Sequence, residues 1–288
     1  LFEDWLSART TFDFKTDVYW REVDNKRASR KRKKAAGRAL GESDYVMTLP
    51  PAYAGPELGA DLAKRWEAFT AKRDQERNVK PPEPKPGVDD FLAAARAEFD
   101  FVPERIPERE FKRRYAREAL ALGLTKDQVV RIYALETSGL GTADMVAGIH
   151  PIKRTGTPIS SAIGYAQLLA ANSVSELVTS GNALIARLRQ LSPSASINYE
   201  RAALILLKID ALKKMTAAAK SFPNKWDNHM AYARTKKGMG IHAINLDGYI
   251  GPWLQVIKIK GLKEAASRRG LGNLTGAEIE LMNLAGPG

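Results

Sequence analysis

The feature that most constrains the fold of this 288-residue chain is a proline-rich segment at residues 78–88. It holds four prolines in eleven residues (NVKPPEPKPGV). Because proline fixes φ and has no backbone N–H, such a stretch favours a stiff, extended chain over a helix or a central strand. The segment predicts a linker between an N-terminal appendage, residues 1–77, and a domain at residues 89–288 that is long enough to fold alone.

After this linker the sequence pattern is helical. Apolar residues recur every three or four positions, as in helices with one buried face. Capping boxes at Thr125–Gln128 and Thr275–Glu278 mark two helix starts. Helices are expected at residues 61–77, 91–99, 107–122, 125–136, 160–171, 182–191, 199–221 and 275–284. No run of alternating strands is visible, apart from a short hairpin expected near residues 239–260. The prediction is a mainly α fold with an irregular N-terminal appendage.

The composition is that of a globular protein, with 44% hydrophobic and 27% charged residues. The longest apolar run, residues 202–207 (AALILL), falls short of the about 18 residues that a membrane span needs and is expected in a buried helix. There is no cysteine, which excludes disulfides, thiol nucleophiles and cysteine-based zinc sites. The three histidines are far apart and lack zinc-motif spacing, so a zinc site is not expected.

Positive charge is in surplus toward both ends of the chain, in residues 1–40 and 201–288. The formal net charge is +12, and the block between Lys26 and Arg38 (KRASRKRKKAAGR) holds eight cations and no acid. Such a block repels itself and is typical of a flexible arm. It suits contact with an anionic partner, namely nucleic acid, anionic lipid or an acidic polymer. A solvated, partly helical tail without a partner is an equal alternative.

Glu136 is the first candidate for chemistry. It lies at the expected C-terminal end of a helix, in the sequence YALETSG (residues 133–139), with no Lys or Arg within four positions. The negative end of the helix and the apolar neighbours both disfavour an ionised carboxyl group. A carboxyl that stays protonated near neutral pH is what a general acid requires. The ordinary alternative is a surface glutamate at a helix end.

A second candidate segment spans residues 161–169 (SAIGYAQLL). Gly164 permits close approach of another chain segment or a ligand to the backbone. Gln167 carries an amide suited to hydrogen bonding a sugar hydroxyl or N-acetyl group, or else to satisfying nearby backbone at the edge of the core.

Together the two segments resemble the lysozyme-like lytic transglycosylases, a family with goose-type lysozyme-like catalytic domains. That family shows Glu-Ser after a helix and then Gly-Ala-x-Gly-Leu-Met-Gln. Glu136 matches the catalytic Glu, Thr137 the Ser after it, and residues 164–167 (GYAQ) the Gly-Leu-Met-Gln. Ser161 stands where the earlier Gly is expected, and residues 148–158 read as an inserted loop. The resemblance covers about residues 125–191.

The family also has an Ala-Tyr-Asn-Ala-Gly segment whose tyrosine reaches the catalytic Glu. Tyr232, in the sequence AYAR, echoes it with Asn replaced by Ala, and Tyr249 is an equally plausible source of the hydroxyl. The substrate-binding residues that the resemblance implies are Thr137, Ser138, Gly164, Tyr165, Gln167, Tyr232 and Tyr249.

The resemblance implies a peptidoglycan lytic transglycosylase in the periplasm or secreted. It would cleave the bond between N-acetylmuramic acid (MurNAc) and N-acetylglucosamine (GlcNAc) in the glycan strands. Glu136 would act as general acid and then as general base, giving a 1,6-anhydro product without a second carboxylate, metal or cofactor. Were the reaction hydrolytic instead, Asp144 is the nearest later acid, although a solvated loop or helix-cap acid is its ordinary interpretation.

Two other functions remain open from the sequence. One is a catalytically silent glycan-binding or cell-wall-binding module of the same fold, since Thr137, Ser161 and the incomplete tyrosine motif depart from the family pattern. The other is a basic helical nucleic-acid-binding protein that uses the block between Lys26 and Arg38 together with C-terminal cations.

Overall fold

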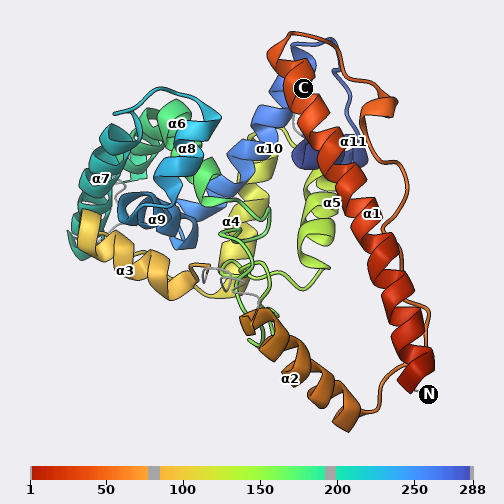
Figure 1. Ribbon diagram of the computed structural model, residues 1–288. Coiled ribbons are helices and arrows are strands. Elements are labelled where there is room, and N and C mark those ends of the chain that lie inside the picture. Colours follow the sequence, from red (N-terminus) through yellow and green to blue (C-terminus); the bar gives the residue numbers. More distant parts are fainter. Residues whose placement is uncertain (1, 77–84, 192–198, 286–288) are drawn as a thin grey trace. The chain divides into compact units, whose positions relative to one another are not determined.

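The structure is a computed structural model that describes residues 2–76, 85–191 and 199–285. The chain forms two compact units, Leu1–Pro82 and Glu83–Gly288 (Figure 1). This division lies inside the linker expected at residues 78–88, of which residues 78–84 lie outside the described residues.

The predicted mainly α fold is confirmed. The described residues form eleven α-helices and two short 3-10 helices, and they contain only isolated β-bridges instead of strands (Figure 1). Among these described helices, none combines the length and the apolar character needed to cross a membrane.

The N-terminal unit is helical, so the prediction of an irregular appendage is wrong. It comprises α1 (Phe2–Ala35), η1 (Glu42–Asp44) and α2 (Ala60–Glu76). The basic block does not form a flexible arm, because α1 runs through most of it. Acidic residues occupy the first turn of α1 and Arg32, Lys33 and Lys34 the last, an arrangement that favours the helix dipole at both ends.

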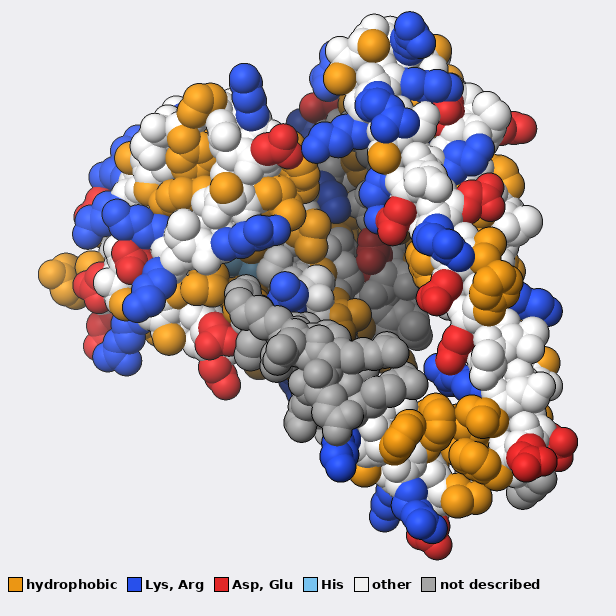
Figure 2. All heavy atoms as spheres, viewed as in Figure 1, with side chains coloured by type: hydrophobic (Ala, Val, Ile, Leu, Met, Phe, Trp, Pro, Cys, Tyr) orange, Lys and Arg blue, Asp and Glu red, His pale blue; other side chains and the backbone are white. Residues whose placement is uncertain are grey.

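Aromatic contacts join the two ends of this unit's chain. Trp5 of α1 stacks edge-on against Trp66 of α2 with 5.1 Å between ring centroids, and Phe2 and Phe69 extend the cluster. Figure 2 shows hydrophobic side chains gathered where the start of α1 meets α2. Contacts among these rings, of which Trp5 is buried, stabilise α1 against the repulsion of its own cations.

The C-terminal unit contains the remaining helices. They are α3 (Val88–Phe99), α4 (Glu108–Ala121), α5 (Lys126–Thr137), α6 (Ala170–Leu191), α7 (Tyr199–Ala219), α8 (Trp226–Ala233), α9 (Lys236–His242), η2 (Ala243–Leu246), α10 (Gly251–Ser267) and α11 (Gly276–Ala285). Helix α6 lies beside α7, α3 beside α9, α10 against α4, and α11 against α5 (Figure 1). The core sits between these pairs.

Local helix signals in the sequence are confirmed by hydrogen bonds. Thr125 Oγ1 accepts from Gln128 N at 3.2 Å, and Gln128 Oε1 accepts from Thr125 N at 3.0 Å, which is the expected capping box of α5. Glu278 Oε2 accepts from Thr275 N at 2.7 Å at the start of α11. These short-range motifs depend only on neighbouring residues, so the sequence alone suffices to place them.

Two expected elements are wrong. Residues 160–169 form no helix, because Gly164 (φ +78) and Gln167 (φ +42) adopt left-handed backbone conformations. Helix α6 begins at Ala170, well before the expected helix at residues 182–191. The hairpin expected near residues 239–260 is instead helical, in α9, η2 and α10. There Gly240 packs against the backbone of α3, and this tertiary contact outweighs glycine's low helix propensity.

The apolar run at residues 202–207 is helical as expected but is not buried as a whole. Leu204, Leu206 and Leu207 are exposed, whereas Ile205 is buried. Ile205 and the apolar residues one and two turns after it in α7 face α6. The helical period of 3.6 residues places the three exposed leucines on the solvent side.

Candidate functional site

Glu136 is the next-to-last residue of α5, which ends in a tight turn. Ser138 adopts a left-handed conformation (φ 51) directly after the helix, and Leu140 N donates to Thr137 O at 3.0 Å. Thr137 is buried and its Oγ1 donates back to Tyr133 O at 2.5 Å. The turn therefore fixes the backbone on both sides of Glu136, and Thr137 uses its hydroxyl for the helix itself.

The Glu136 carboxyl group is half-buried between helices that are distant in sequence. Asn283 Nδ2 of α11 donates to Glu136 Oε1 at 2.6 Å. Burial and the neighbouring Glu280 carboxylate raise the pKa of Glu136, and these effects outweigh the lowering by Lys258 and by the Asn283 hydrogen bond. The expectation of a carboxyl that resists ionisation therefore has a physical basis in this environment.

Three carboxyl groups gather around one lysine here. We call Glu136 (α5), Glu176 (α6), Lys258 (α10) and Glu280 (α11) the carboxylate cluster. Burial raises the pKa of Glu176 to about 7, against a smaller lowering by Lys258. Glu280 is buried, and desolvation raises its pKa too. With one cation for three acids, all three carboxyl groups hold their protons more tightly than a free glutamate does, which favours proton donation.

The pKa of Lys258 is lowered, whereas the pKa values of the three cluster carboxyl groups are raised. Burial lowers the pKa of Lys258, and the three cluster carboxylates only partly offset that effect. No Lys or Arg lies within four positions of Glu136, so the local sequence contains no sign of this cation. It comes from α10, 122 positions later in the chain. A usable signal was present, since Lys258 lies between Ile257 and Ile259 on a mostly buried helix.

The expected substrate-binding segment around Gly164 packs against α10. A Cβ on Gly164 would lie 2.5 Å from Gln255 Nε2, and Gln255 Oε1 accepts from Tyr165 N at 2.8 Å. Gln167 Nε2 donates to Gly164 O at 2.8 Å and to Met145 O at 3.2 Å. The close approach at Gly164 is thus to a protein side chain, and the amide group of Gln167 braces its own loop.

Tyr165 is fully buried. Its ring contacts Phe111, Tyr115 and Tyr133 edge-on, with centroids 5.7, 5.0 and 5.5 Å away, and its hydroxyl donates to Glu108 Oε1. Burial and the Glu108 carboxylate raise the pKa of Tyr165, so its proton is retained. Tyr165 is therefore part of the packed core between α4 and α5.

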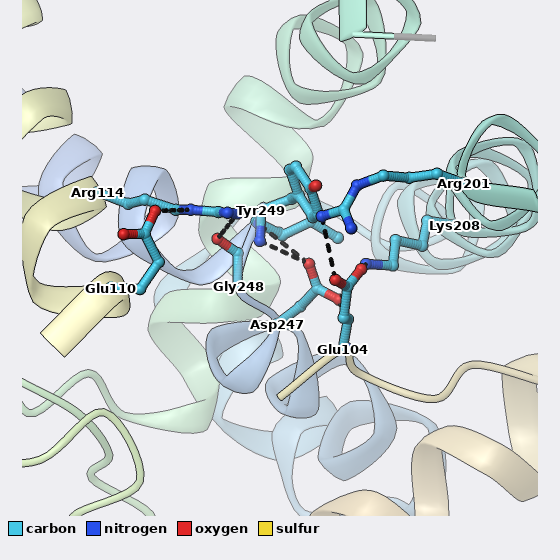
Figure 3. A network of polar contacts seen from close by, with 9 residues as sticks. Glu104, Glu110, Arg114, Arg201, Lys208, Asp247, Gly248 and Tyr249 are labelled. Atoms are coloured by element: carbon cyan, nitrogen blue, oxygen red, sulfur yellow. Dashed lines mark hydrogen bonds and ion pairs between the residues drawn. The ribbon is translucent and has the colours of Figure 1, made fainter. Parts of the chain in front are cut away.

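The two candidate tyrosines lie on other elements. The Tyr232 ring, on α8, packs 4.6 Å from that of Phe222. The Tyr249 ring has three cations around it, Arg114 at 4.6 Å, Lys208 at 4.8 Å and Arg201 at 5.0 Å (Figure 3). Among the described contacts, neither tyrosine hydroxyl meets Glu136.

A buried ion network surrounds Tyr249 (Figure 3). Lys208 Nζ contacts Glu104 Oε2 at 2.8 Å and Asp247 Oδ2 at 2.9 Å. Asp247 is fully buried and accepts from the backbone N–H groups of Glu104, Tyr249 and Ile250. Burial raises the pKa of Asp247, while Lys208 lowers it. The network ties α7 to the loop before α10, so it is structural.

Asp144, the alternative second carboxylate, is held by cations. Arg105 Nη2 lies 2.8 Å from its Oδ2, and Arg154 Nη2 lies 3.1 Å from its Oδ1. Burial raises the pKa of Asp144, but the hydrogen bond from Thr142 and the two arginines outweigh this effect, so the pKa lies below its usual range. An acid held ionised in this way is unsuited to donate a proton.

A Ser-His-Asn chain lies deeper in the unit. His242 Nε2 is 2.7 Å from Ser161 O, which can only accept, and His242 Nδ1 is 2.8 Å from Ser173 Oγ. Burial lowers the pKa of His242 to about 4, so the ring is neutral and Nδ1 accepts from Ser173. Asn245 Nδ2 donates in turn to Ser173 Oγ at 2.8 Å. All three side chains are fully buried, so the chain braces α6 and α9 and is closed to substrate.

Comparison with protein-family models, with curated proteins and with solved structures yields no match. Among the described residues, no group of three or more His, Cys, Asp or Glu side chains is arranged to hold a metal ion.

Proposed function

We propose that this chain is a peptidoglycan lytic transglycosylase with a lysozyme-like catalytic domain, periplasmic or secreted, and that Glu136 is its general acid and base. The observation that supports the proposal most is the environment of Glu136. The carboxyl is half-buried at the end of α5, and burial together with Glu280 raises its pKa. A catalytic acid needs partial access to solvent together with a pKa above its usual value.

The proposed reaction balances without water. Protonated Glu136 donates to the oxygen that links MurNAc C1 to GlcNAc, and the C1–O bond breaks as GlcNAc leaves with that proton. Glu136, now ionised, removes the proton from the MurNAc C6 hydroxyl. The O6 atom then forms a bond to C1, which gives the 1,6-anhydro sugar and restores the protonated acid.

The surrounding residues divide into two roles under this proposal. Thr137, Gly164 and Tyr165 are positioning residues, because each is engaged with the protein and not with solvent. Ser138 is exposed directly after Glu136 and is available for contact with the glycan, whereas the part-buried Gln167 already donates its amide N–H groups to Gly164 O and Met145 O and is a further positioning residue.

A catalytically silent glycan-binding module is the second candidate, and one observation favours it. Asn283 and Lys258 both stabilise the ionised form of Glu136, which opposes its use as an acid. The two candidates differ in turnover, since only the enzyme releases soluble fragments.

The deciding experiment incubates the full chain with purified peptidoglycan and analyses the soluble products by mass spectrometry. Wild type is expected to release anhydro-muropeptides, and Glu136→Gln is expected to release none. Glu264→Gln, an exposed change on α10, is the matched control and should keep the activity.

Other outcomes count against the proposal. Products that carry an added water would make the protein a hydrolase, and Glu176 and Glu280 would then be tested as the second carboxylate before Asp144. No products together with intact peptidoglycan pull-down would favour the silent module. If the chain showed neither turnover nor pull-down of peptidoglycan, the proposed cell-wall function would be ruled out.

A further inference from the structure

The basic block on α1 is divided into two faces. Lys26, Arg30 and Lys33 recur at helical spacing, so they share one face of α1. All three meet the segment that follows the helix. Lys26 Nζ donates to Ser43 O at 2.5 Å, Arg30 Nη1 donates to Asp44 O at 2.7 Å, and Lys33 Nζ lies 2.6 Å from Asp44 Oδ1. These three cations therefore hold α1 against the segment that follows it and stabilise the N-terminal unit.

Asp44 anchors this contact. It is buried, with 5% of its surface exposed, and it also accepts from Gly41 N at 3.0 Å. The hydrogen bond from Lys33 and that from Gly41 lower the pKa of Asp44, so the carboxylate stays ionised. Because Asp44 fixes which face of α1 turns inward, it also fixes which cations turn outward.

A second set of cations faces solvent. We call Arg27, Lys31 and Lys34 the basic stripe; they recur at helical spacing on a face about a quarter-turn away from the first. All three are exposed. Arg27 pairs with Asp24 at 2.7 Å, with more than 60% of both side chains exposed, whereas Lys31 and Lys34 form no ion pair among the described residues. At 1.5 Å per residue the stripe extends about 10 Å along the helix.

An exposed aromatic side chain extends the same face. Trp20 lies two turns before Arg27 and is 48% exposed. Together with Asp17, Arg21 and Asp24 it lines a hollow on α1. Figure 2 shows Lys and Arg side chains gathered over the end of α1 that carries the stripe.

We propose that the basic stripe and Trp20 form a binding surface for single-stranded nucleic acid. Cations in a row meet successive backbone phosphates, and an exposed indole ring offers a base a stacking surface. A membrane surface fits less well. The exposed apolar residues Phe14 and Val18 lie on a different face of α1 from the basic stripe, and Arg21 and Asn25 interrupt that face within two turns. This binding is independent of the proposed glycosidase, whose residues all lie in the other unit.

The test titrates the full chain into a fluorescein-labelled 20-nucleotide single-stranded DNA and follows anisotropy at several salt concentrations. Three phosphate contacts predict a log–log salt slope of about −2. Lys31→Glu/Lys34→Glu should weaken binding at least tenfold. The matched control, Lys64→Glu/Lys72→Glu, makes the same charge change at exposed positions of α2 and should weaken it far less.

Trp20→Ala distinguishes nucleic acid from other anionic polymers. Loss of one stacked base should weaken DNA binding roughly 5- to 150-fold and leave the affinity for inorganic polyphosphate unchanged. The proposal is overturned if both double variants weaken binding equally, or if Trp20→Ala has no effect while polyphosphate competes as well as DNA. Binding only to vesicles that contain phosphatidylglycerol would also overturn it. Circular dichroism of each variant confirms that α1 remains folded.

Discussion

Glu176 should make the stability of the C-terminal unit depend on pH. Its pKa is about 7 in the folded protein against 4.5 for a free side chain. A carboxyl whose pKa is raised by folding binds its proton more tightly in the folded state. Its cost to stability is therefore absent at low pH, appears as the pH rises above 4.5 and is complete above 7.

The size of the effect follows from the two pKa values. A tenfold difference in protonation is worth about 1.4 kcal/mol, so the full cost is about 3 kcal/mol at pH 8 and about 1 kcal/mol at pH 5. Gln cannot ionise and is close to the protonated acid in shape. We therefore expect Glu176→Gln to raise the free energy of unfolding by about 3 kcal/mol at pH 8 and by about 1 kcal/mol at pH 5.

The assay is urea denaturation of wild type and variant at pH 5, 6, 7 and 8, followed by circular dichroism at 222 nm. Glu200→Gln, an exposed change at the start of α7, is the control and should show a small, pH-independent difference. The burial argument would be refuted if the gain in unfolding free energy from Glu176→Gln did not increase between pH 5 and pH 8, or if the variant were less stable than wild type at pH 8.

Three further predictions concern buried residues of the C-terminal unit. Lys208→Met leaves Asp247 buried without its cation and should cost about 3–5 kcal/mol in unfolding free energy, measured by urea denaturation; a loss below 1 kcal/mol would contradict the network. Gly164→Ala forces a Cβ toward Gln255 at a positive φ and should lower the unfolding free energy by about 1–3 kcal/mol, whereas an unchanged melting temperature would show that the loop yields. The pKa of His242 falls from 6.5 to about 4 on folding, so its share of stability, present above pH 6.5, should be lost as the pH falls toward 4, by about 3 kcal/mol. The difference between wild type and His242→Gln should shrink by that amount between pH 7 and pH 4.

Much of the helical content was predictable because it rests on local signals. The capping boxes at Thr125 and Thr275 and the periodic apolar residues of α3, α4 and α5 involve residues within one or two turns of each other. The failures arise where distant contacts decide the backbone. Examples are the left-handed Gly164 and Gln167, which end the expected helix at residues 160–171, and Gly240, whose packing on α3 makes α9 helical.

The candidate site was predictable only in part, for the same reason. The end of a helix and its apolar neighbours already marked Glu136 as a carboxyl that resists ionisation. The three residues that shift its pKa, Glu280, Lys258 and Asn283, come from two other helices, α10 and α11. No pattern of spacing along the chain links residues that only the folded arrangement brings together.

The length of α1 has a consequence for any ligand of its basic end. A helix of 34 residues rises about 51 Å, whereas a flexible chain of the same length spans only about 30 Å on average and takes many shapes. Ordering such a chain on a ligand would cost about 1 kcal/mol or more per immobilised residue. In this protein the ordering accompanies folding, so α1 presents its cations in a preorganised row, and a partner loses little conformational entropy of the protein when it binds.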